Sequence, residues 1–86
     1  MRVIYQKKFQ KEFLKLSPKL KQRFYERLEI FMIDKFDKVL NNHSVDTAYR
    51  GCRSINITGD CRAIFREERN LVIFVAIGTH SQLYGR

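Results

Sequence analysis

The chain has 86 residues, which suits a single domain over residues 1–86 with one compact core. Its formal net charge is +8 at pH 7, which favours an anionic partner: nucleic acid, an acidic membrane surface or an acidic protein. Two cysteines are too few for a secreted disulfide scaffold, and the longest apolar run, residues 71–77, is too short to span a membrane. With no signal-peptide pattern, we expect a cytoplasmic protein with reduced thiols.

The cationic residues change type along the chain. All lysines lie at or before Lys38, and every cationic residue after it is an arginine. Arginine binds a phosphate through two parallel hydrogen bonds, which lysine cannot do, so the second half of the chain is the better place for phosphate contacts. A drift in composition without functional meaning is the alternative.

The first half of the chain predicts one strand and two helices. Residues 2–5 are β-prone, and apolar residues then recur at helical spacing up to Leu16. Ser17 and Pro18 supply an N-cap hydroxyl and a proline for the first helical position, so a second helix begins there. Its apolar stripe reaches residue 32 and can be continued to Leu40. We expect the two helices to form a hairpin.

The second half predicts three strands. Turn-favouring residues open a loop over residues 41–51, and strand-like runs follow at residues 52–58, 61–66 and 71–77. The short connections between them predict an antiparallel meander. The order β-α-α-β-β-β therefore predicts an α+β fold, in which a helical hairpin packs on one face of a small antiparallel sheet and leaves the other face open.

The alternation along these strands is irregular near Gly59. Arg62 shares a face with Ile64, and Arg53 shares a face with Ile55, so charged and apolar side chains are mixed. Strand twist, a bulge at Gly59 and a functional surface on the sheet all explain this mixture, and the sequence leaves the three open.

Several side chains in loops and at strand ends suit phosphodiester transfer in RNA. The tail at residues 78–86 places His80 and Tyr84 directly after the last strand, and His43 and Asp60 lie in the preceding connections. The reaction needs a base for a ribose 2′-OH, an acid for the leaving oxygen and cations for the phosphate. His80 suits acid or base, Asp60 suits base or histidine-orienting roles, and Tyr84 suits base stacking or proton donation.

Structural explanations stand beside each of these roles. His80 could be a solvated or capping residue, Asp60 could cap an ordinary Gly-Asp turn, and Tyr84 could simply close the sheet. The two histidines with Cys52 and Cys61 have zinc-ligand chemistry, but the cysteines lie nine residues apart across a predicted hairpin, which disfavours a metal site. Both thiols fall inside strands, where cysteine is usually a core residue. We therefore expect no metal and no cofactor.

Four stretches in order carry a resemblance to a known family. They are LNNH at residues 40–43, YRGCRSI at 49–55, GDCRAIF at 59–65 and IGTHSQLY at 77–84. With them the chain resembles the RelE/YafQ-type toxins of bacterial and archaeal toxin–antitoxin modules, within the RelE/StbE-like branch. The resemblance extends over the whole chain in size and element order. It implies the RelE-like fold, a small antiparallel sheet with a helical hairpin on one face.

The resemblance also implies a function and partners. Such toxins are endoribonucleases that cleave mRNA in the ribosomal A site by 2′-OH attack without a metal, and a cognate antitoxin neutralises them. By position His43 matches a loop histidine of YafQ-like members, Asp60 a strand aspartate, His80 the C-terminal histidine and Tyr84 the terminal aromatic. The implied partners are mRNA on the ribosome, 16S rRNA along the basic surface and an acidic antitoxin protein, with no membrane.

The chain departs from the family pattern at Asn56, where YafQ-like members have a histidine. An amide cannot transfer protons at neutral pH, so either the two histidines of this chain suffice or activity is weakened. Arg53 and Arg62 become the expected phosphate ligands, as arginines are in RelE-like members. Arg50 and Asn56 complete the set expected to contact RNA, with a solvated side chain as the alternative for Arg50.

Two other functions fit the sequence. A ParE-like relative with the same fold would poison a topoisomerase without cutting RNA, although His80 and Asp60 argue against it. A basic RNA- or ribosome-binding module without catalysis would fit the charge and Asn56.

Overall fold

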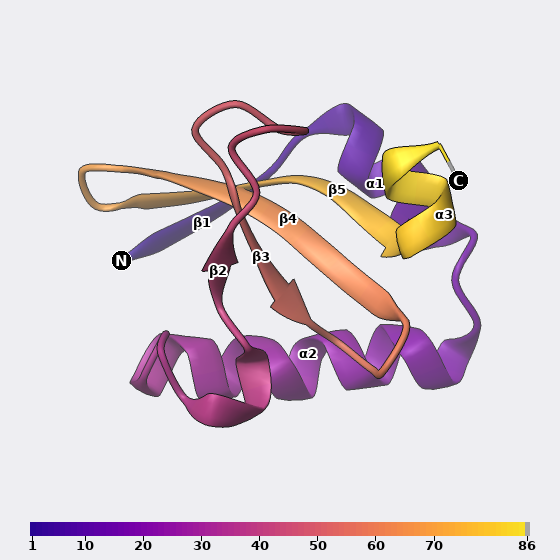
Figure 1. The fold of residues 1–86 in the computed structure, drawn as a ribbon. Coiled ribbons are helices and arrows are strands. Elements are labelled where there is room, and N and C mark those ends of the chain that lie inside the picture. Colours follow the sequence, from indigo (N-terminus) through magenta and orange to yellow (C-terminus); the bar gives the residue numbers. More distant parts are fainter. Residues whose placement is uncertain (86) are drawn as a thin grey trace.

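The computed structural model describes residues 1–85, and Arg86, part of the predicted functional tail, lies outside the described residues. Figure 1 shows the chain from the first strand to the C-terminal helix. In chain order the elements are β1 (Arg2–Tyr5), α1 (Lys7–Leu14), α2 (Pro18–Ile33), a 3₁₀ turn (Lys38–Leu40), β2 (His43–Ser44), β3 (Arg53–Asn56), β4 (Cys61–Glu68), β5 (Leu71–Thr79) and α3 (His80–Tyr84).

The strands form one sheet in the order β1-β5-β4-β3-β2. The predicted meander of β3, β4 and β5 is antiparallel, and the α+β architecture is confirmed. The prediction differs in one respect, because β1 pairs with β5 in parallel and the sheet is mixed. The helices connect β1 to the strands at the opposite edge of the sheet. The meander then crosses back, and its last strand, β5, lies beside β1 and runs in the same direction.

One face of the sheet is covered by α1 and α2 and holds the main core. Phe24 of α2 is fully buried, and its ring centroid lies 5.3 Å from that of Phe74 on β5 and 5.4 Å from that of Phe9 on α1. Phe31 meets Phe65 of β4 edge to face at 5.1 Å. Burying each such ring stabilises the fold by about 1.5–3 kcal/mol, so the helices are fixed to the sheet mainly by aromatic packing.

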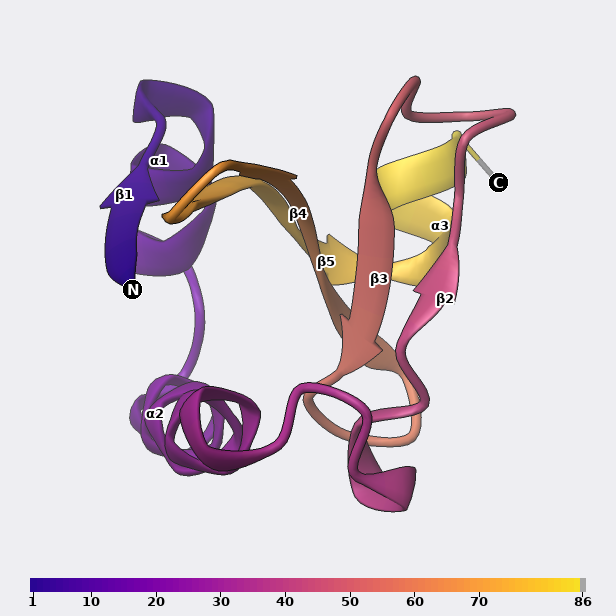
Figure 2. The same ribbon diagram turned by 90° about the vertical axis from the view of Figure 1, so that its left-hand side faces the viewer.

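The two helices are connected through these rings but cross steeply. Figure 2 looks down the axis of α2 while α1 is seen from its side, so the two helices of the predicted hairpin pack on the sheet in crossed orientations. The N-terminus of α2 is as predicted, with Pro18 in the first turn and the Ser17 hydroxyl accepting from the amide of Leu20 at 3.2 Å. The crossing lets each helix cover a different part of the sheet.

Helix α2 ends at Ile33, so its suggested continuation to Leu40 is wrong. The Asp34 carboxylate accepts from the amide of Phe36 at 3.0 Å, and the Asp37 carboxylate accepts from the amide of Val39 at 3.0 Å. Short acidic side chains of this kind offer the backbone an alternative to the helical hydrogen bond, and two in succession end the helix. Leu40 is nevertheless buried, at the end of the 3₁₀ turn.

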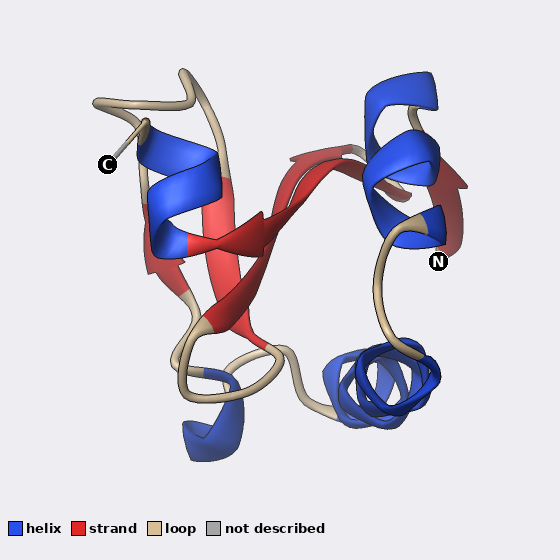
Figure 3. Cartoon of the chain, turned by 90° about the vertical axis from the view of Figure 1, so that its right-hand side faces the viewer, coloured by secondary structure: helices blue, strands red, loops and turns tan. Residues whose placement is uncertain are grey.

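We call the sheet surface away from α2 the distal face. It was expected to be open, but α3 and the segment 45–52 cover part of it, as Figure 3 shows for α3. Leu83 of α3 packs there in one cluster with Cys52 of that segment, Ile64 of β4 and Ala76 of β5. The β4–β5 register shifts between Ile64 and Phe65, so the ladder has an irregularity there.

The segment after α2 also contains a strand that the sequence did not predict. His43 and Ser44 form β2 at the edge of the sheet, paired with Ser54 and Arg53 of β3. A two-residue strand is too short for alternation to reveal. Within residues 1–85, no helix combines the length and apolar character needed to cross a membrane.

Candidate active site

Polar residues of three adjacent strands share the distal face. Ser54 and Asn56 project from β3 on this face, Asn56 lies directly opposite Arg62 of β4, and Arg62 lies opposite Gly78 of β5. Directly paired residues of an antiparallel ladder project to the same side, so these positions form a row across the sheet, which we call the distal row. Gly78 contributes no side chain to the row, which leaves Arg62 beside a flat stretch of backbone.

Buried polar atoms in this row have no partner within residues 1–85. They are the Ser54 hydroxyl, the Asn56 carbonyl oxygen and the Arg62 Nε. Ser54 is fully buried, and the other two residues are partly exposed. A buried polar group without a hydrogen bond costs about 1–3 kcal/mol, so a cluster of them is typical of a site that receives a polar ligand or ordered water.

His43 joins the distal face from β2, because it pairs directly with Ser54. Its Nδ1 lies 2.7 Å from the carbonyl oxygen of Asn41, which is itself held in a left-handed conformation with φ 47°. A carbonyl oxygen only accepts, so Nδ1 carries the proton and donates it. In the neutral imidazole Nε2 then has a free lone pair, which is the state that a general base requires.

His80 and Asp60 flank the last pair of the β4–β5 ladder. That pair is Cys61 with Thr79, so Asp60 directly precedes β4 and His80, the first residue of α3, directly follows β5. Both side chains are exposed at the same end of the sheet. The fold thus brings together three of the predicted residues: Asp60, Arg62 and His80.

The α3 helix that holds His80 is set by a capping box. The Thr79 hydroxyl accepts from the Gln82 amide at 3.2 Å, and the Gln82 side chain accepts from the Thr79 amide at 2.8 Å. Thr79 is therefore the cap, and the capping role considered for His80 belongs to its neighbour. The His80 ring lies 4.6 Å from the ring of Tyr84, centroid to centroid, one turn later. The buried apolar residues of the distal face form what we call the distal cluster: Cys52, Ile64, Ile73, Val75, Ala76 and Leu83. Tyr84 also packs against this cluster, so packing accounts for part of its role.

The turn before β4 is capped by Thr58. Its hydroxyl accepts from the amides of Asp60 and Cys61 at 3.3 and 3.0 Å. Among residues 1–85, no hydrogen bond uses the Asp60 carboxylate, so the turn-capping explanation does not apply to it. Arg27 of α2 donates to the carbonyl of Ile57 at 3.3 Å and ties this turn to the helix layer. The carboxylate is thus carried on a fixed turn and points to solvent.

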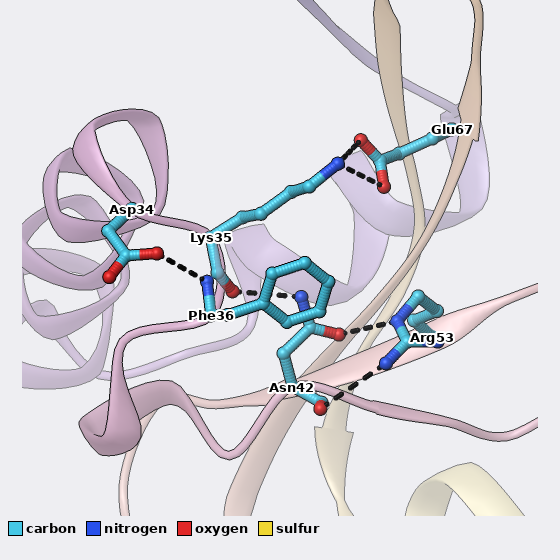
Figure 4. A network of polar contacts seen from close by, with 6 residues as sticks. All are labelled: Asp34, Lys35, Phe36, Asn42, Arg53 and Glu67. Carbon is cyan, nitrogen blue, oxygen red and sulfur yellow. Dashed lines mark hydrogen bonds and ion pairs between the residues drawn. The ribbon is translucent and has the colours of Figure 1, made fainter.

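Arg53 is not brought to this row. It lies next to Ser54 on β3 and so projects to the helix-covered face, where its guanidinium donates to the Asn42 side chain at 2.7 Å and stacks 5.7 Å from the Phe36 ring (Figure 4). Asn42 in turn donates to the Lys35 carbonyl at 2.9 Å. Arg53 therefore secures the segment after α2. Arg50, an exposed residue in the segment 45–52, also lies outside the row.

The two cysteines lie on opposite faces of the sheet. Cys52 belongs to the distal cluster and Cys61 to the main core, and both are free. Burial raises the pKa of the Cys61 thiol to about 11, with a smaller contribution from Asp60. Within residues 1–85, no group of three or more His, Cys, Asp or Glu side chains is placed to hold a metal ion. The zinc arrangement considered from the sequence does not form.

Sequence reasoning did not select Ser54, Asn41 or the α3 helix. The buried, unpaired hydroxyl of Ser54 and the carbonyl of Asn41 depend on the β2–β3 pairing, for which no sequence signal exists. The helix did have a signal, because Thr79 and Gln82 form the T-x-x-Q pattern of a capping box.

Comparisons with known proteins agree with this architecture. The crystal structure of YafQ from E. coli strain BL21(DE3) superimposes with a TM-score of 0.78 at 23% identity, covering 99% of this chain and 100% of that one. YafQ in the E. coli DinJ–YafQ complex gives 0.76 at 24% identity, covering 99% and 100%. The RelB–RelE antitoxin–toxin complex from Methanococcus jannaschii gives 0.74 at 14% identity, covering 95% of each chain. At these identities the likeness establishes the fold.

A family model gives more than the fold. The model described as the bacterial toxin of the type II toxin–antitoxin system, YafQ, matches residues 1–85. By class, therefore, this small α+β domain with a cationic sheet row is a toxin of a type II toxin–antitoxin system. The chain belongs to the YafQ toxin family, as the resemblance in its sequence motifs predicted. No curated protein sequence matches it.

Proposed function

We propose that this toxin is an endoribonuclease that cleaves mRNA in the ribosomal A site by attack of a ribose 2′-OH, without a metal. The observation that carries the proposal is the distal row, in which Arg62 and Asn56 present unpaired polar atoms between the His43 edge and the His80 end of the sheet. A phosphate placed on this row would meet a guanidinium, and the histidines would lie to its two sides.

In the proposed reaction His43 acts as the base. Its Nδ1–H is held by the Asn41 carbonyl, so Nε2 accepts the proton of the 2′-OH as the 2′ oxygen attacks phosphorus. Arg62 stabilises the negative charge that grows on the phosphorane. His80, as imidazolium, gives its proton to the departing 5′ oxygen, leaving a 2′,3′-cyclic phosphate and a 5′-hydroxyl. Asp60 orients His80 from the neighbouring position of the ladder.

Asn56 takes part as a hydrogen-bonding group. Its amide is both donor and acceptor, so it orients the phosphate or the attacking hydroxyl without exchanging a proton. Proton transfer then rests on the two histidines. We propose that Tyr84, beside His80, provides the aromatic surface for a nucleobase.

The proposed partners follow from charge and family. The net charge of +8 favours the ribosome, where 16S rRNA would contact the basic surface and mRNA the distal row. We further propose that an acidic antitoxin, encoded with the toxin, folds over this surface and blocks it, as DinJ and RelB accompany the toxins in the complexes compared above.

Cleavage of a defined mRNA on programmed ribosomes tests the proposal. We expect wild type to cut in the A site, and His80→Ala, His43→Gln and Asp60→Asn to lose about 10²–10⁴-fold in rate, the usual contribution of a general acid or base, with Asp60→Asn at the low end. Arg53→Gln is the matched control, because Arg53 lies on the other face. A 2′-deoxy substitution at the scissile nucleotide should abolish cutting.

Other outcomes point to the other functions. Cleavage that persists on the 2′-deoxy substrate would exclude 2′-OH attack. DNA-damage signalling in cells with intact mRNA would indicate a ParE-like topoisomerase poison, and ribosome binding without cleavage would indicate a non-catalytic module.

A further inference from the structure

The segment 45–52 anchors the C-terminal turn of α3. The Tyr49 hydroxyl donates to the carbonyl oxygen of Leu83 at 2.7 Å, and the Tyr49 ring meets the Tyr84 ring edge to face at 5.9 Å. Carbonyls in the last turn of a helix have no partner within the helix. The Leu83 carbonyl therefore receives its hydrogen bond from a residue that lies 34 positions earlier in the chain.

Helix α3 needs such an anchor, because its five residues cannot stay helical on their own. The Thr79–Gln82 capping box holds its first turn, and the Leu83 side chain packs in the distal cluster. Apart from the Thr79 cap, the Tyr49 hydroxyl is the one side chain outside α3 that forms a hydrogen bond with this helix among residues 1–85. The orientation of the last turn, which carries Tyr84, depends on this bond.

The segment that holds Tyr49 is itself well fixed. The amide of Val45 donates to the Cys52 carbonyl at 3.0 Å, and the amide of Cys52 donates to the Tyr49 carbonyl at 3.0 Å. The Tyr49 amide donates to the Val45 carbonyl at 2.8 Å, and the Asp46 carboxylate accepts from the Gly51 amide. Burial raises the pKa of the Tyr49 phenol, so the hydroxyl keeps its proton and remains a donor. The anchor thus connects two fixed parts of the molecule.

We infer that Tyr49 is a positioning residue of the proposed nuclease site, which holds α3 so that Tyr84 and His80 keep their place beside Arg62. The inference rests on the proposed function for its effect on catalysis. The path is short: Tyr49 fixes the Leu83 carbonyl and the Tyr84 ring, and the Tyr84 ring lies 4.6 Å from that of His80. A small displacement of an acid group from its reacting atom lowers the rate steeply.

The test is Tyr49→Phe, which removes only the hydroxyl and keeps the ring. Tyr25→Phe is the matched control, since Tyr25 is an exposed tyrosine of α2. We expect Tyr49→Phe alone to change the His80 Hε1 chemical shift, because that proton senses the ring current of Tyr84. We also expect faster hydrogen exchange at the amides of Leu83, Tyr84 and Gly85, while the main-core amides of β5 keep their protection.

The same pair of variants is then compared in cleavage on programmed ribosomes. A positioning role predicts that Tyr49→Phe lowers the single-turnover rate about tenfold, while the toxin concentration for half-maximal rate changes by less than about twofold. A purely structural role would instead lower the amount of active protein and leave the rate per active molecule unchanged. Tyr25→Phe should match wild type in both quantities.

The outcomes separate this inference from the proposed function. An unchanged His80 Hε1 chemical shift in Tyr49→Phe would overturn the inference. Global unfolding of this variant would also overturn it, since the hydroxyl would then support the whole fold. A changed shift with an unchanged cleavage rate would also overturn it. If wild type does not cleave mRNA at all, the proposed function fails, and so does the effect of Tyr49 on catalysis. A changed His80 chemical shift in Tyr49→Phe would still establish that Tyr49 positions α3.

Discussion

Arg53 and Arg62 lie on neighbouring strands of the sheet but project from opposite faces. Arg53 is bonded to Asn42 on the side of the helices, and the Arg62 Nε is unpaired on the distal side. The two arginines therefore differ in what they can do for a phosphate, although they were equivalent candidates before the strand register was known.

The first prediction compares glutamine substitutions at these two arginines. Arg62→Gln should lower the cleavage rate about 10²–10³-fold, because it removes the cation nearest the proposed phosphate. Arg53→Gln should stay within about twofold in rate but lose about 1 kcal/mol of unfolding free energy, since a partly buried hydrogen bond is lost. Single-turnover cleavage and urea unfolding measure the two effects. Equal loss of cleavage in both variants would contradict the assignment of faces.

The second prediction concerns Gly78, where a methyl group would lie 2.7 Å from the Gln82 side-chain oxygen. Gly78→Ala should push that side chain away and break its bond to the Thr79 amide, at a cost of about 0.5–1.5 kcal/mol. Gln82→Ala should cost a similar amount, and the double variant no more than either single one. Thermal unfolding of the three variants measures this, and fully additive losses would show that the capping box is not what Gly78 protects.

The third prediction concerns Cys61, whose folded-state pKa is about 11 against 9.0 in the unfolded chain. Because the folded pKa is the higher one, the protonated thiol stabilises the fold below pH 9, and this contribution is lost as pH rises towards 11. The unfolding free energy of wild type should therefore approach that of Cys61→Ala over this range. Unfolding curves of both proteins at several pH values test it, and a constant difference between them would contradict the buried-thiol explanation.

The fourth prediction compares adjacent aromatic residues of α2. Phe24 is fully buried and Tyr25 is 53% exposed. Phe24→Ala should cost about 3–5 kcal/mol, because it leaves a cavity beneath both helices, whereas Tyr25→Ala should cost about 1 kcal/mol. Chemical denaturation distinguishes them. Similar losses at both positions would mean that the aromatic cluster is not the main support of the helices.

The fold was predictable where a local pattern decides the structure. The stripe that includes Phe24 and the Ser17 cap fixed the start of α2, and β-prone runs with short turns predicted the meander. The parallel pairing of β1 was not predictable, since no local signal selects its partner. The end of α2 was missed because Asp34 and Asp37 compete with the helix through side-chain hydrogen bonds, which periodicity does not register.

The residues of the candidate site are a prediction from the sequence, whereas their arrangement depends on the fold. Alternation separated the two faces within each strand, but only the strand register puts Asn56 opposite Arg62 and brings Asp60 to the end of the ladder that His80 follows. The roles of Arg53 and Tyr49 depend on partners 11 and 34 positions away in the chain. Such bonds arise from tertiary packing, and a single sequence contains no periodic trace of them.

The pairing of β1 with β5 has a consequence for how the toxin folds during synthesis. β1 can find its neighbour only after residues 71–79 have been synthesised, and His80 follows that neighbour directly. A nascent chain still lacking β5 has neither a finished sheet nor the histidine that we propose as the acid. Translation that stops before β5 would therefore release a fragment without the proposed site.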